Sequence, residues 1–155
     1  MVRISPSVAK NMMRRSLAAI VDPPPTPAQV EELWRYFGGE CVYCGVTIPR
    51  SSRTGHLDHL VASGTNSIFN LALACAKCNG DEKRELPWRE FLQRKARYSV
   101  AYSEREVRIE AWLARGAVET PAPYDHGAVA AIIAEATDAY DSAVTKMRRL
   151  RDDRV

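Results

Sequence analysis

Two cysteine pairs, Cys41-Val42-Tyr43-Cys44 and Cys75-Ala76-Lys77-Cys78, frame the stretch Gly55-His56-Leu57-Asp58-His59-Leu60 and decide how this chain folds. These pairs contain every cysteine of the chain. Two Cys-x-x-Cys turns suit the tetrahedral thiolate coordination of zinc. We see no secretory signal in the sequence, so disulfide bonds are the less favoured interpretation. The sequence therefore predicts one structural Zn²⁺ bound by Cys41, Cys44, Cys75 and Cys78. The alternative is an accidental spacing of free thiols.

The composition sets the broad class of protein. The 155 residues are 46% hydrophobic and 26% charged, which excludes a disordered tail, a collagen-like repeat or a coiled-coil rod as the whole chain. The longest apolar run, Ala128–Ala134, is far shorter than the about 20 residues that a membrane span needs. The net charge of +3 is too small to indicate a nucleic-acid partner by itself. We expect a cytoplasmic protein without a membrane span.

Helical patterns precede the cysteine frame. Apolar spacing predicts a helix over residues 7–21, and Pro23-Pro24-Pro25 ends it as a stiff spacer. Thr26 is a good N-cap, and Gln29 completes a capping box that opens a helix to about Phe37.

Helical patterns also follow the frame. They predict helices over residues 87–98 and 103–116, the second opened by a capping box at Ser103–Glu106. We therefore expect three consecutive segments: a helical extension over residues 1–39, the cysteine-framed core over residues 40–86, and a helical region over residues 87–155.

The last predicted helix, over residues 127–151, carries apolar residues at alternating steps of four and three. This heptad seam consists of Val129, Ile133, Ala136, Tyr140, Ala143, Met147 and Leu150. Such a seam indicates either a helix packed on its own domain or a contact with a second copy or partner protein.

The stretch between the cysteine pairs carries the chemistry. A strand there places His56 and Asp58 on one face and His59 on the other. A second short strand is predicted around residues 71–74, followed by a helix that starts near Cys75 and lets Asn79 face Asp58. Carboxylate and amide oxygens are hard ligands that suit Mg²⁺ or Mn²⁺, and His59 has the chemistry of a general base acting on water.

Residues 41–84 resemble the HNH endonucleases, whose core is the ββα-metal fold. The resemblance lies in the order of Cys-x-x-Cys, Asp58-His59, Asn70-Leu71, a second Cys-x-x-Cys with Asn79 directly after it, and then basic residues. It implies an α+β fold, with a ββα-metal core, a four-cysteine structural zinc site, and flanking N- and C-terminal helices. It also implies metal-dependent hydrolysis of DNA phosphodiesters that leaves 5′-phosphate and 3′-hydroxyl ends.

The resemblance implies a role for each matching residue. His59 matches the general base, and Asp58 and Asn79 match the protein ligands of a single catalytic Mg²⁺ or Mn²⁺. Asn70 matches a structural residue that braces the loop across the hairpin and keeps His59 aimed.

The remaining positions concern the substrate and the geometry. Lys83 or Arg84 matches a basic position that contacts phosphate, although Lys83 stands one place further from Asn79 than the family pattern has it. The loop from His59 to Asn70 is shorter than the common pattern. For His56 the open interpretations are an accessory metal ligand, a phosphate contact, a support for catalytic water, or a purely structural residue.

A non-catalytic, zinc-stabilised module that binds nucleic acid or protein is the alternative function. The implied partner is DNA, with a homodimer or partner protein held through the C-terminal helix as a further expectation. The settings that the resemblance leaves open are restriction or phage defence, phage DNA packaging and mobile-element cutting, and it favours prokaryotic defence or phage biology.

Overall fold

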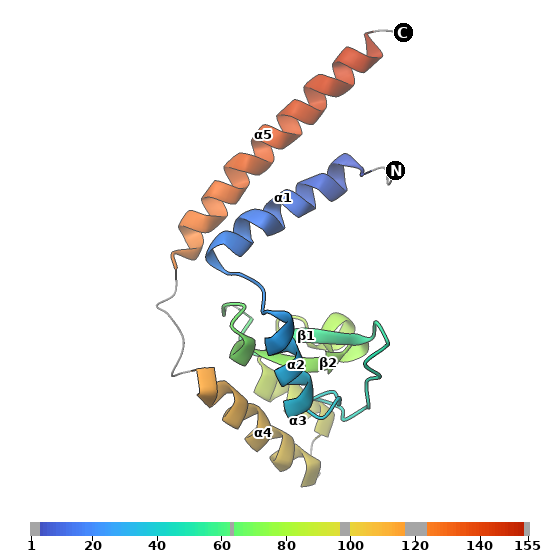
Figure 1. Ribbon diagram of the computed structural model, residues 1–155, viewed down its shortest axis with the longest axis vertical. Helices are drawn as coiled ribbons and strands as arrows, with labels where there is room; N and C mark the ends of the chain where they lie inside the picture. The colour runs from blue at the N-terminus through green and yellow to red at the C-terminus, as the bar shows by residue number, and fades with distance from the viewer. Residues whose placement is uncertain (1–3, 63, 97–99, 117–123, 154–155) are drawn as a thin grey trace. The chain divides into compact units, whose positions relative to one another are not determined.

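The computed structural model describes residues 4–62, 64–96, 100–116 and 124–153, which form two compact units (Figure 1). One unit comprises residues 24–121, and the other comprises residues 1–23 together with 122–155. This grouping differs from the three consecutive segments expected from the sequence. Within the described ranges, no helix is long and apolar enough to cross a membrane.

The larger unit is built on an antiparallel hairpin. Strand β1 (Gly55–His59) pairs with β2 (Leu71–Cys75), and the register sets Asp58 opposite Ala72 and His59 opposite Leu71. The 3-10 helix η1 (Ile68–Asn70) leads into β2, and the π-helix η2 (Lys77–Lys83) follows it. Because residues 71–74 are all buried, β2 lies inside the core while β1 forms its edge.

Three α-helices enclose this hairpin: α2 (Pro27–Tyr36), α3 (Trp88–Ala96) and α4 (Val100–Gly116). Each contributes fully buried side chains to the same core, including Leu33 from α2, Leu92 from α3 and Trp112 from α4. The Trp112 indole donates hydrogen bonds from Nε1 to the carbonyls of Ile68 (3.1 Å) and Leu71 (2.8 Å). A helix from the far end of the unit therefore fixes the start of β2.

The helix boundaries test the local signals. The capping box at Thr26 is confirmed. The Thr26 hydroxyl accepts from the backbone amide of Gln29, and the backbone amide of Thr26 donates to Oε1 of the Gln29 side chain. The capping box at Ser103 is wrong as a helix start, because α4 already begins at Val100. Tyr102 packs against the core, and this tertiary contact extends the helix past its local cap signal. The predicted end of the preceding helix, near residue 98, lies outside the described residues.

The smaller unit pairs α1 (Pro6–Val21) with α5 (His126–Asp152), which lie side by side (Figure 1). Lys10 forms an ion pair with Asp141 at 2.9 Å, and the Tyr124 hydroxyl donates to Asp22 at 3.0 Å, so the two helices run antiparallel. Neither helix contains a buried residue.

The predicted heptad seam is divided in this pair. Its first members, Val129, Ile133, Ala136 and Tyr140, are half-buried, whereas Met147 and Leu150 are 67% and 59% exposed. Packing on α1 therefore accounts for the first half of the seam only.

Candidate metal centre and active site

The four cysteines form one cluster. Their sulfur atoms all lie within 4.8 Å of one another, and the Sγ atoms of Cys44 and Cys75 are 3.8 Å apart. A tetrahedral site with Zn–S bonds of about 2.3 Å has sulfur atoms about 3.8 Å apart. The cluster could hold a metal ion, and its size and donor type fit Zn²⁺.

The thiols are partly removed from water. Cys41 and Cys78 are buried, and burial raises the pKa of Cys41 to about 11 and also raises the pKa of Cys78. A zinc-thiolate bond requires deprotonated sulfur, so zinc binding displaces protons and zinc affinity falls as the pH falls.

The turn that holds the first cysteine pair has its own supports. The Gly45 amide donates to the Cys41 carbonyl at 2.8 Å, and Gly45 adopts a φ of 75°, which favours glycine. Arg105 of α4 donates from Nη1 to the Tyr43 carbonyl at 2.9 Å. The cysteine turn is thus held to α4 by a hydrogen bond as well as by packing.

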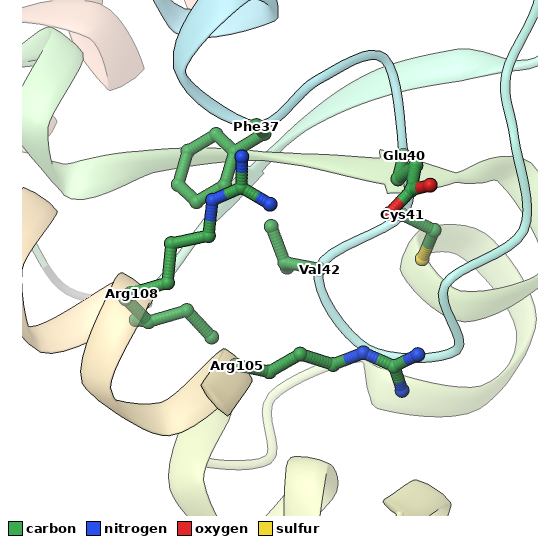
Figure 2. A pocket seen from close by; sticks show the side chains of 7 residues that line it. Phe37, Glu40, Cys41, Val42, Arg105 and Arg108 are labelled. Carbon is green, nitrogen blue, oxygen red and sulfur yellow. The ribbon is translucent and has the colours of Figure 1, made fainter. Parts of the chain in front are cut away.

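Figure 2 shows a small pocket between this turn and α4. Its lining residues are Phe37, Glu40, Cys41, Val42, Arg105, Arg108 and Ile109. The cavity of about 20 Å³ has room for little more than one water molecule. Both arginines that line it are hydrogen-bonded to backbone carbonyls, Arg105 to that of Tyr43 and Arg108 to that of Tyr36, so they connect α4 to the preceding segments.

A second, open cleft contains the predicted catalytic residues. Its lining brings together Asp58 and His59 from β1 with Asn79 from η2, in a space of about 230 Å³. The other lining residues are Leu57, Ala62, Lys83, Arg84 and Glu85. Asn79 lies 21 positions after Asp58 and 20 after His59. They meet because the hairpin turns the chain back and η2 follows β2.

The His59 ring is oriented by an amide. Its Nε2 lies 3.1 Å from Oδ1 of Asn66, and an amide oxygen can only accept a hydrogen bond. In this arrangement Nε2 carries the proton and Nδ1 is the basic nitrogen. The contact favours the tautomer that leaves Nδ1 as the proton acceptor, as a general base requires. No sequence pattern singled out Asn66, since its contact depends on the conformation of the loop.

Asp58 is deeply buried, with 5% of its surface exposed. The Tyr43 hydroxyl donates to its Oδ2 at 2.5 Å, and Lys83 Nζ lies 3.2 Å from Oδ2 and 3.3 Å from Oδ1. Burial raises the pKa of Asp58, and the Tyr43 and Lys83 contacts oppose that rise. Burial and the Asp58 charge raise the pKa of Tyr43, so this hydroxyl keeps its proton and remains a donor.

Lys83 lies where a phosphate contact from the surface is not expected. Only 1% of the residue is exposed, and its ammonium also donates to the His59 carbonyl at 2.8 Å. The segment from Asn79 to Lys83 lies within the π-helix η2 (Lys77–Lys83), whose i to i+5 winding accommodates the one additional residue between Asn79 and the basic position. Arg84, which ends this helix with a φ of 48°, is exposed at the cleft and remains the predicted phosphate contact. No local sequence pattern indicates that Tyr43 and Lys83 meet at Asp58.

His56 stands apart from these residues. It pairs with Ala74 in the hairpin, is exposed, and does not line the cleft that the described residues form. An accessory role for His56 therefore stays a prediction.

Asn70 holds the loop that follows β1. Its Oδ1 accepts from the Val61 amide at 3.0 Å, and its Nδ2 donates to the carbonyls of Val61 (3.2 Å) and Thr65 (2.9 Å). The loop so fixed leads directly to Asn66, which contacts His59.

We expect Asn70→Asp to destabilise the protein by about 1–3 kcal/mol, because it removes two donors and turns an acceptor toward two carbonyl oxygens. Urea denaturation measures the change, with Asn11→Asp on the exposed surface of α1 as the amide-to-acid control. Equal denaturation midpoints for Asn70→Asp and the unchanged protein would contradict the bracing role.

The larger unit has a β-hairpin followed by a helix, a cluster of four thiols that joins them to the preceding turn, and a cleft with Asp58, His59 and Asn79. These features define a domain of the ββα-metal class. Residues 41–85 match the family model described as HNH endonuclease, so this part of the chain is an HNH domain. The match includes all four cysteines and the cleft residues from Leu57 to Glu85. A comparison with curated proteins found no match.

Proposed function

We propose that this protein is a metal-dependent endonuclease that hydrolyses DNA phosphodiester bonds. The observation that carries the proposal is the meeting of Asp58, His59 and Asn79 in one open cleft of an HNH domain. HNH domains are typical of nucleases, and this cleft offers a base, two oxygen ligands and an exposed cation.

The residues present fit a hard divalent cation. Asp58 and Asn79 supply oxygen donors on one cleft, and the hydrogen bonds from Tyr43 and Lys83 leave the Asp58 carboxylate with further lone pairs. A bound Mg²⁺ or Mn²⁺ would supply charge that stabilises the phosphoryl oxygens and the leaving oxygen.

The chain's own residues would perform the proton transfer and the positioning. His59, held through Nε2 by Asn66, accepts a proton from the attacking water at Nδ1. Arg84 contacts the phosphate from the rim of the cleft, while Asn70 keeps the intervening loop in place. Attack by water needs no covalent intermediate with the protein.

The alternative is a zinc-stabilised module that binds nucleic acid or protein without cutting. Measuring binding and nicking on the same supercoiled plasmid, with Mg²⁺ or Mn²⁺ present, separates the two functions. We expect nicking at protein concentrations where binding occurs, and a parallel RNA substrate tests the preference for DNA. Binding without nicking under all these conditions would favour the module.

Because zinc binding needs reduced thiols, we also propose a compartment that keeps thiols reduced, such as the cytoplasm.

We further propose that two copies of the chain act together through the helices of the smaller unit. A single site cuts one strand, so a double-strand cut needs two sites. Neither α1 nor α5 contains a buried residue, and Met147 and Leu150 are exposed on α5. Sedimentation should show a dimer, free or bound to DNA. A monomer in both states would exclude the pair.

A further inference from the structure

Asp58 and Lys83 are the charged side chains that are buried among the residues the structure describes. They form an ion pair with each other, at 3.2 Å between Nζ and Oδ2, in which the lysine side chain is 1% exposed and the aspartate side chain 6%. A buried charge without a partner is strongly unfavourable, so each of these groups depends on the other.

The Lys83 ammonium joins the two functional residues of β1. It contacts the carboxylate of Asp58, the proposed metal ligand, and it donates to the backbone carbonyl of His59, the proposed base. Tyr43, which lies in the turn between Cys41 and Cys44, donates a further hydrogen bond to the Asp58 carboxylate. The carboxylate is therefore held in place and electrostatically compensated by groups of the protein itself.

We propose that Lys83 is a positioning residue that acts as a resident cation: it compensates Asp58 before a metal arrives and thereby sets how weakly the cleft binds a divalent cation. This inference rests on the proposed function, because it takes Asp58 as a metal ligand. A divalent cation at Asp58 lies close to the ammonium, and two positive charges at one carboxylate repel each other. Metal affinity at the cleft is then lower than the same ligands provide without Lys83.

The proposal makes an unusual prediction for Lys83→Met, which removes the charge and keeps an unbranched apolar chain. Without metal, the variant is less stable, because Asp58 is left buried and uncompensated. With metal, it binds Mn²⁺ about tenfold more tightly or better, because the repulsion is gone and the cation relieves the unpaired carboxylate. If Lys83 had only a structural role, Lys83→Met would lower the stability and leave the affinity for Mn²⁺ unchanged.

The experiment titrates Mn²⁺ into the full, zinc-loaded chain and measures free Mn²⁺ by electron paramagnetic resonance, with zinc content checked throughout. Lys77→Met is the matched control, since Lys77 lies on the same π-helix with its side chain 75% exposed. We expect tighter binding for Lys83→Met, unchanged binding for Lys77→Met, and a larger rise in the thermal midpoint on adding Mn²⁺ for Lys83→Met than for the unchanged protein. If Lys83→Met does not fold, Lys83→Gln supplies the neutral side chain and keeps a donor for the His59 carbonyl.

Two further variants separate the possible failures. Lys83→Arg keeps the charge and should show no tightening, whereas Asp58→Asn combined with Lys83→Met should lose the tight binding. Binding that depends on Asp58 but is equal or weaker in the folded neutral variants would overturn the role of Lys83 alone. Mn²⁺ binding that is absent, or independent of Asp58, would overturn the metal site and the proposed function with it.

Discussion

The change His59→Ala is expected to lower the rate of plasmid nicking by about 10²–10⁴-fold, the usual contribution of a general base. The ring is held through Nε2 by Asn66 and lies in the cleft with Asp58 and Asn79, so its removal leaves water without a proton acceptor. The fold should survive, because the His59 contacts with Lys83 and β2 use the backbone. The measurement is the initial nicking rate at saturating Mn²⁺.

The matched control is His126→Ala, which removes an exposed histidine at the start of α5 in the other unit. It should nick at the unchanged rate. Zinc content and the thermal midpoint should be the same in both variants and the unchanged protein. A His59→Ala protein that retains zinc and nicks at more than about a tenth of the normal rate would exclude His59 as the base, since a base contributes at least about 10²-fold.

The change Cys78→Ser is expected to unfold the larger unit. The Cys78 sulfur is buried within the thiol cluster, and structural zinc sites contribute apparent free energies of about 10–16 kcal/mol at neutral pH. That range matches or exceeds the about 5–15 kcal/mol that stabilises a whole domain. The cluster also joins the turn at Cys41 to η2, so its loss separates the elements that hold Asp58 and Asn79 together.

Near-ultraviolet circular dichroism, which reports on the buried aromatic side chains such as Trp112 and Tyr43, and a zinc assay measure this outcome together. Stripping zinc from the unchanged protein with a strong chelator should reproduce the loss, and adding Zn²⁺ back should reverse it. A Cys78→Ser protein with a native near-ultraviolet spectrum and an unchanged thermal midpoint would show that the cluster is not needed for folding.

Features with short-range causes were predictable from the sequence. The spacing of the four cysteines predicted that their thiols cluster, and the Thr26 capping box needs only four consecutive residues to form. The second short strand predicted around residues 71–74 is β2. The HNH resemblance placed Asp58, His59 and Asn79 in one site, and the structure brings all three to one cleft.

Features that depend on tertiary contacts were not predictable. The burial of Lys83 follows from the π-helical winding of η2. From the sequence it was evident only that Lys83 stands one residue further from Asn79 than in the family pattern. The contact of Asn66 with His59 depends on the loop that Asn70 braces. The pairing of Lys10 with Asp141 joins residues 131 positions apart, so no local pattern could specify it.

The central claim, hydrolysis of DNA by a divalent metal in the HNH cleft, is tested most directly by one measurement. Zinc-loaded protein is incubated with supercoiled plasmid in metal-free buffer, and Mg²⁺ or Mn²⁺ is then added while zinc content is monitored. We predict no conversion to the open circle before the addition, conversion after it, and 5′-phosphate ends on the product. An intact plasmid at every concentration of either metal, with zinc fully bound, would contradict the account.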